Sequence, residues 1–123
     1  MSKHRDLLVW QEAHAFRVRI HHLTAGARWR QSPRVVGQIR ASSASIADNI
    51  AEGRASKSDP VYLRYLNIAL ASGGETDSQI AGLLDEHLIS AEVAFDLTDE
   101  LAIIRRMLLA LHKSVKNRPP TRC

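Results

Sequence analysis

The sequence predicts an all-α fold, an antiparallel up-down-up-down bundle of four helices. Apolar residues recur at steps of three and four along four segments of the chain, and this spacing lines one face of a helix. Short stretches containing glycine, proline or serine separate the segments, and helices joined by short connections pack as antiparallel neighbours. No run of residues alternates polar and apolar side chains for long, so no strand is predicted.

The first two helices are separated by a turn that contains Gly26. The first is predicted over residues 6–24. The second begins at Pro33, with Ser32 as its capping residue, because proline is suited to the first helical position. It ends at Gly53. The apolar positions are Val9, Ala13, Phe16, Ile20 and Leu23 in the first helix and Val36, Ile39, Ile46 and Ile50 in the second.

The third and fourth helices begin after serine residues. The third is predicted to open on Ser58, Asp59 and Pro60 and to run to about Ile89. The fourth starts near Ser90 and ends before Pro119. Their apolar positions are Leu63, Leu66, Leu70, Ile80 and Leu84, and Leu97, Leu101, Ile104, Leu108, Leu111 and Val115.

The length of 123 residues predicts one domain, over residues 1–118, with a disordered tail over residues 119–123. Cys123 is the only cysteine, so a disulfide within the chain is excluded and a reducing, cytoplasmic location is expected. Every apolar stretch is far shorter than the ~20 residues that span a bilayer, so no membrane association is expected.

Folding the second, third and fourth helices against one another places three charged residues at one level. Arg40 is predicted beside Glu75, and Glu75 beside Arg105. A carboxylate removed from water is tolerated when guanidinium groups pair with it. We therefore predict a structural polar layer of these residues, with Asn49 and Glu52 beside the seam of the second helix. Three solvated side chains are the alternative.

The formal net charge of +4 conceals a strong asymmetry. Between Glu75 and Glu100 there are eight acidic residues and no lysine or arginine, whereas residues 1–40 contain eight lysines and arginines. A cluster of cations can neutralise phosphates and release their counterions. The sequence therefore predicts a nucleic-acid-binding surface at the end of the bundle that gathers Arg54, Lys57, Arg64, Lys113, Lys116 and Arg118.

No catalytic or metal site is predicted. None of the six histidines follows an acidic residue by three positions, as the di-iron bundles require, and no cofactor motif is present. Ser42, Ser43 and Ser45 have no histidine at their level to act as a base. Trp29, between two arginines, could stack on a nucleic-acid base, but covering the first hairpin is the favoured interpretation.

Several motifs resemble those of the proteins encoded in intervening sequences of bacterial 23S rRNA genes. They are the order Leu8-Val9-Trp10-Gln11, the segment Ser45-Ile46-Ala47-Asp48-Asn49-Ile50-Ala51-Glu52-Gly53, and Tyr65-Leu66-Asn67-Ile68-Ala69 with Ser72 and Glu75. That family is also similar to the accessory variability determinant of diversity-generating retroelements. That determinant is a basic bundle that forms ring-shaped pentamers and associates with a reverse transcriptase and nucleic acid. The resemblance implies a homo-oligomer, a pentamer, without enzymatic activity.

Two functional hypotheses follow. The first is a non-enzymatic oligomeric bundle that binds RNA or DNA through its basic end. The second is an oligomeric scaffold for a protein partner such as a reverse transcriptase, in which the charges set the register of the subunits and nucleic-acid binding is incidental.

Overall fold

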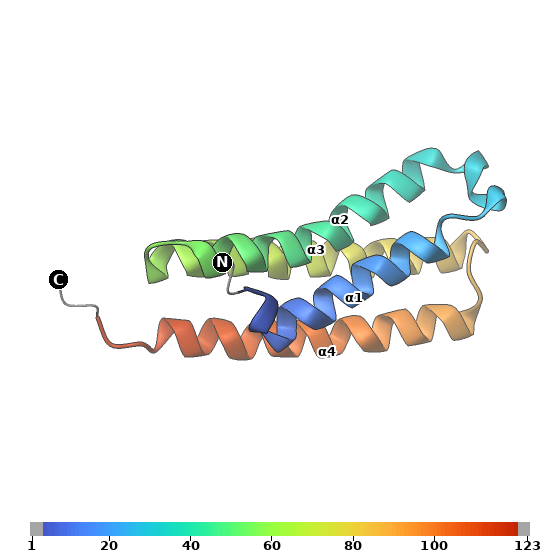
Figure 1. Cartoon of the computed structure of the whole chain (residues 1–123). Coiled ribbons are helices and arrows are strands. Elements are labelled where there is room, and N and C mark those ends of the chain that lie inside the picture. Colours follow the sequence, from blue (N-terminus) through green and yellow to red (C-terminus); the bar gives the residue numbers. More distant parts are fainter. Residues whose placement is uncertain (1–3, 121–123) are drawn as a thin grey trace.

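The computed structural model describes residues 4–120 and is all-α within them, with four helices and no strand. Their bounds are α1 Leu8–Leu23, α2 Pro33–Ala55, α3 Asp59–Asp85 and α4 Ala91–Lys116. Two short 3-10 helices accompany them, η1 His4–Asp6 before α1 and η2 Ala27–Gln31 between α1 and α2. In Figure 1 the α2–α3 connection lies at one end of the molecule, and the α1–α2 and α3–α4 connections lie at the other.

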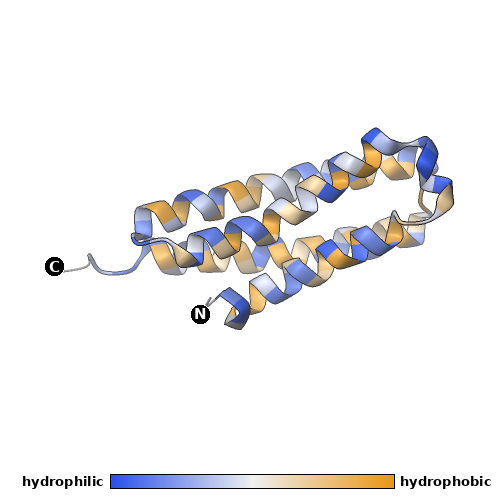
Figure 2. Ribbon diagram, turned by 45° about the horizontal axis from the view of Figure 1, so that its top comes forward, coloured by the Kyte–Doolittle hydropathy of each residue, from blue (hydrophilic) through white to orange (hydrophobic). Residues whose placement is uncertain are grey.

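The core consists of the apolar positions that recur at helical spacing. Figure 2 shows hydrophobic and hydrophilic residues following one another in bands along every helix, as expected of helices with one buried face. Helix α2 packs mainly on α3, α3 packs also on α4, and α1 covers α2 and part of α4. The largest fully buried side chains are Phe16, Ile20, Ile39, Ile46, Ile50, Leu66, Ile80, Leu83, Leu97, Leu101, Ile104 and Leu108.

Serine residues cap the last two long helices, which begin where the sequence predicted them to begin. The Val61 backbone N–H donates to Ser58 Oγ at 3.4 Å, and the Val93 N–H donates to Ser90 Oγ at 3.1 Å. Ser32 occupies the capping position of α2, but its side chain makes no capping hydrogen bond. Proline at the start of α2 has no backbone N–H, so one fewer N–H group at this helix end needs a hydrogen-bond acceptor.

Helix α3 ends four residues before the predicted Ile89. His87 has a positive φ of 60°, and its N–H donates to the Leu84 carbonyl at 3.0 Å. The Leu88 N–H donates to the Leu83 carbonyl at 2.9 Å, which completes a Schellman motif. The end was misplaced because this motif usually contains glycine at the left-handed position, and here the position holds histidine.

After α4 the residues Asn117 to Pro120 have no regular secondary structure. Of the predicted tail 119–123, residues 121–123 lie outside the described residues. Within residues 4–120, no helix combines the length and the apolar character that a membrane span requires.

Candidate nucleic-acid interface

The structure does not join Arg40, Glu75 and Arg105 into the predicted polar layer. Arg40 Nε donates to Thr24 Oγ1 at 2.8 Å, and Arg40 Nη2 donates to the His21 carbonyl at 3.3 Å. Glu75 is exposed, so the prediction that this carboxylate is removed from water is wrong. Arg40 turns toward the C-terminus of α1, where carbonyl groups and the helix dipole favour a cation.

Uncharged side chains form the polar contact between α2 and α3 instead. Ser42 Oγ donates to Gln79 Oε1 at 2.6 Å and accepts a bond of 2.8 Å from Thr76 Oγ1. One turn further along, Ser45 Oγ and Ser72 Oγ are 2.8 Å apart. Neutral groups of this kind can be buried in pairs at a much lower desolvation cost than a carboxylate and two guanidinium groups.

Asn49 extends this uncharged contact, whereas Glu52 does not. Asn49 Nδ2 donates to the Ser45 carbonyl at 2.7 Å and to Ser45 Oγ at 2.9 Å. Asn49 therefore fixes the hydroxyl that faces Ser72. Glu52 is exposed on the same helix.

Arg105 lies across the glycine pair of α3. A β-carbon added to Gly73 would lie 3.2 Å from Arg105 Cγ, and one added to Gly74 would lie 3.8 Å from Arg105 Nη2. The absence of side chains at these two positions gives the half-buried arginine its space between α3 and α4.

At the other end of the Asn-Ile-Ala-Glu-Gly segment, Gly53 lies against an aromatic ring. A β-carbon added to Gly53 would lie only 2.8 Å from Tyr62 Cδ1 and 3.1 Å from Tyr65 Cβ. Gly53 therefore allows the last turns of α2 and the first turns of α3 to approach closely. Tyr62 was not identified from the sequence, although the folding of α2 on α3 that places Arg40 beside Glu75 also places residue 62 level with Gly53.

Tyr62 lies among three charged residues. The Arg118 guanidinium carbon is 5.8 Å from the centre of its ring, and Arg118 Nη1 pairs with Asp59 Oδ1 at 3.1 Å. The Tyr62 hydroxyl and Arg54 Nε are both buried, and neither makes a hydrogen bond of good geometry within the described residues, although the two side chains are close enough to interact. Burial raises the pKa of the Tyr62 hydroxyl above its ordinary 10.0, and the charge of Arg54 opposes part of that rise.

Three of the six residues predicted to bind nucleic acid line one open pocket of about 480 Å³ beside Tyr62 and its neighbours. The start of α3 and the end of α4 form its walls. Arg54 lies behind it through its contact with Tyr62, whereas Arg64 and Lys113 are exposed outside its lining. The lining residues are Lys57, Ser58, Asp59, Pro60, Leu63, Val115, Lys116, Arg118, Pro119 and Pro120.

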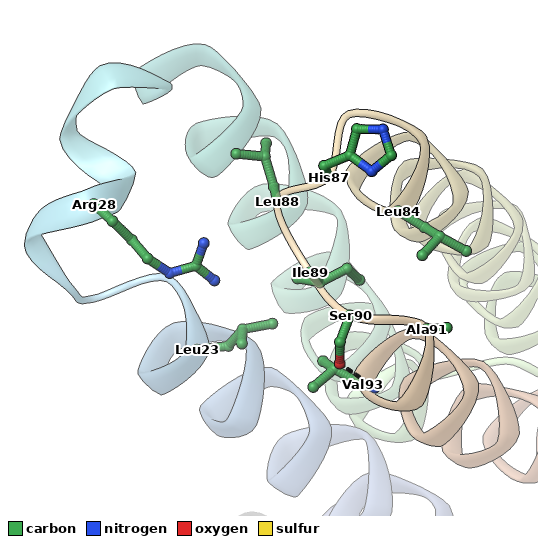
Figure 3. Close-up of a pocket in the computed structure, with 9 residues that line it drawn as sticks. All are labelled: Leu23, Arg28, Leu84, His87, Leu88, Ile89, Ser90, Ala91 and Val93. Atoms are coloured by element: carbon green, nitrogen blue, oxygen red, sulfur yellow. Dashed lines mark hydrogen bonds between the residues drawn. The ribbon is translucent and has the colours of Figure 1, made fainter.

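A second open pocket lies at the opposite end of the molecule. Figure 3 shows Arg28 extending from η2 toward the end of α1, with the α3–α4 connection on the other side. Its lining is mostly apolar, with Arg28 and His87 as the titratable groups. Trp29 is only 3% exposed and belongs to the core, which confirms that it covers the first hairpin; the Arg28 guanidinium lies 4.5 Å from the centre of its ring.

The described residues offer no cluster of three or more histidine, cysteine, aspartate or glutamate side chains that could hold a metal ion. The feature that stands out chemically is therefore the combination of Lys57, Lys116 and Arg118 around one pocket, with Arg54 and Tyr62 beside it. Such an arrangement can bind phosphate groups, because each cation contributes donors and charge at an accessible surface.

Comparisons with known proteins agree with this architecture. A crystal structure of a protein of unknown function from the S23 ribosomal protein family of Bacteroides thetaiotaomicron VPI-5482 is similar to this chain, with a TM-score of 0.81 and 25% sequence identity. The match covers 86% of this chain and 96% of that one. No curated protein matches the sequence. The family model described as 23S rRNA-intervening sequence protein matches residues 5–110. The chain therefore belongs to the family of 23S rRNA-intervening sequence proteins.

Proposed function

We propose that this chain is a non-enzymatic, homo-oligomeric protein of the cytoplasm that binds RNA or DNA through the basic end of an antiparallel up-down-up-down bundle. The observation on which the proposal rests is the position of Lys57, Lys116 and Arg118 around one open pocket. All three side chains are exposed, so a phosphate backbone can reach them without any rearrangement of the helices.

The neighbouring groups support phosphate as the ligand. Arg118 Nη1 is paired with the Asp59 carboxylate at 3.1 Å, which holds the guanidinium at the pocket and leaves its other N–H donors for a phosphate oxygen. The N-terminus of α3 also lies at this pocket, and the positive end of a helix dipole favours an anion. None of the residues that line the pocket is aromatic, and the neighbouring Tyr62 is buried, so the binding is to backbone phosphates and tolerates different base sequences.

Self-association increases the affinity of such a surface. One pocket offers few phosphate contacts. In an oligomer, binding of the nucleic acid to one pocket raises its effective concentration at the pockets of the other subunits. A ring of five subunits is the assembly implied by the family resemblance. The same ring without nucleic-acid binding would be the scaffold for a protein partner, such as a reverse transcriptase.

A pair of matched charge reversals tests the proposed surface. Lys57→Glu with Lys116→Glu changes the basic end, and Arg30→Glu with Arg34→Glu changes the net charge equally at the opposite end, where both arginines are exposed. We expect the first pair to lower the affinity for a labelled RNA or DNA at least about tenfold and to reduce the salt slope by about one per lysine. The second pair should have a much smaller effect.

Light scattering and circular dichroism on both variants provide the control for assembly and folding. Equal losses of affinity in the two variants at unchanged mass would show that net charge, and not this pocket, determines binding. Unchanged affinity in the lysine variant would contradict the proposal.

A further inference from the structure

Helix α4 presents apolar side chains on the face opposite the core. Phe95 is 71% exposed and Leu109 is 57% exposed, and Ala102 between them is also exposed. Each is seven residues from the next, which is two helical turns, so the three lie in one line along the helix. An exposed line of this kind on a helix is typical of a surface that packs on another helix.

Four charged residues flank the same line. Glu92 and Asp99 lie in its first half, and Arg106 and Lys113 lie in its second half; all four are exposed. The ion pairs between described residues are Arg17–Asp48, Arg19–Glu100 and Arg118–Asp59, so none involves these four. None of them has an oppositely charged residue three or four positions away on α4, so the helix alone cannot pair them.

The pattern complements itself when two copies of α4 lie antiparallel about Ala102. Phe95 and Leu109 are each seven residues from Ala102, so Phe95 of one copy faces Leu109 of the other. Asp99, three residues before Ala102, then faces Arg106, four residues after it. Glu92 and Lys113, ten residues before and eleven after, face each other at the two ends. In a parallel pair each charged residue would instead face the same residue of the other copy, so like charges would meet.

We propose that the exposed face of α4, defined by Phe95, Asp99, Ala102, Arg106 and Leu109, binds the same face of a second copy of this chain. The two helices are antiparallel, and Ala102 lies on the twofold axis, where its small side chain lets the helices approach closely. The contact buries two Phe95–Leu109 pairs and forms two Asp99–Arg106 pairs, with a Glu92–Lys113 pair at each end.

This contact does not depend on the proposed nucleic-acid surface. Lys57 and Arg118 lie outside α4, and Lys113 was assigned to both surfaces. Lys116 is seven residues after Leu109 and continues the same line, but its antiparallel counterpart would be residue 88, before the start of α4, so it lies beyond the paired segment. The contact is isologous, which means that each copy uses the same face. Two monomers joined by this face form a dimer, and two rings joined by it form a particle of twice the mass.

Cysteine cross-linking tests the position of the twofold axis. In a Cys123→Ser background, Ala102→Cys should form a disulfide-linked dimer under mild oxidation, because the two copies of residue 102 meet on the axis. Ala110→Cys is the matched control, since it is exposed on the same helix and replaces the same residue type. Two copies of residue 110 would lie about 24 Å apart along the paired helices, beyond the reach of a disulfide. No dimer with Ala102→Cys, or equal dimer with both, would overturn the proposal.

A charge exchange tests the antiparallel register independently. Asp99→Arg or Arg106→Asp alone places like charges together twice in the assembly, and each should raise the dissociation constant of pairing at least about tenfold. The double variant carries the exchanged charges on one chain and should restore pairing to within a few-fold of the wild-type value. Sedimentation over a concentration series measures this, with circular dichroism to confirm folding. Folded single variants that pair as well as the wild type, or a double variant that stays as weak as the singles, would contradict the register.

Discussion

Gly53 lies so close to the ring of Tyr62 that a β-carbon on the glycine would be 2.8 Å from Tyr62 Cδ1. The backbone of the last turn of α2 therefore packs directly against an aromatic ring from the first turn of α3. This contact joins the helical core to the basic pocket, because Tyr62 also lies beside Arg54 and Arg118. The position of the pocket thus depends on a residue without a side chain.

We expect Gly53→Ala to destabilise the protein by about 1–3 kcal/mol, because the added methyl group overpacks the contact with Tyr62 and Tyr65. Gly37→Ala on the same helix is the control. A β-carbon there meets nothing within 4 Å, so this substitution should stabilise the protein by about 0.5–1 kcal/mol. Urea unfolding measures both. Similar stabilisation by the two substitutions would show that α2 and α3 are not so close at Gly53.

Replacement of His87 by glycine should stabilise the protein by about 1 kcal/mol. His87 has a φ of 60°, a left-handed conformation that costs an L-residue free energy and glycine almost none. His112→Gly is the matched control, because His112 lies inside α4 and the same replacement there should be destabilising. Thermal unfolding that moves in the same direction for both variants would contradict the Schellman motif at Leu83–Leu88.

The Tyr62 hydroxyl should make stability fall at alkaline pH. Burial raises the pKa of this hydroxyl in the folded protein above 10.0, so the unfolded chain loses the proton first. Below pH 10 this group does not change the free energy of unfolding with pH. Above pH 10 the free energy of unfolding falls as pH rises through the folded pKa, because the folded protein must then bury a charge or hold a proton that the unfolded chain has lost. Tyr62→Phe should remove this part of the pH dependence, which urea unfolding between pH 8 and about 11 measures.

The same substitution should also stabilise the protein near neutral pH by about 1 kcal/mol, since the buried hydroxyl lies near Arg54 but makes no hydrogen bond of good geometry in the described part of the chain. Tyr65→Phe is the control, because Tyr65 is half-buried on the same helix and its hydroxyl is not among the buried polar atoms without a hydrogen-bond partner in the described residues. A loss of stability with Tyr62→Phe would show that the hydroxyl is paired in solution.

Much of the helical architecture could be predicted from the sequence. The residues Val9, Ala13, Phe16 and Ile20 in α1 and Leu97, Leu101, Ile104 and Leu108 in α4 were expected from their spacing and are buried. Periodicity identifies such positions because burial of one face determines which residues of a helix are apolar. Helix starts were predicted well where a serine caps the helix, at Ser58 and Ser90.

Side-chain direction could not be predicted in the same way. Counting residues from the connection between two helices gives the level of a residue along the bundle. It does not give the direction in which the side chain points around the helix axis. Arg40 contacts the end of α1, and Glu75 faces solvent. For the candidate site, Lys57, Lys116 and Arg118 were expected at one end and share a pocket, whereas the role of Tyr62 became visible only through its contact with Gly53.

The most direct test of the proposed function is the affinity of the wild-type protein for RNA and for DNA across a salt series, with its mass measured by light scattering in the same buffers. We expect a stable oligomer that binds nucleic acid. The logarithm of its binding constant should fall steeply and linearly with the logarithm of the salt concentration, because phosphate contacts release counterions. A stable oligomer that binds neither nucleic acid even at low salt would contradict the account and leave the scaffold function.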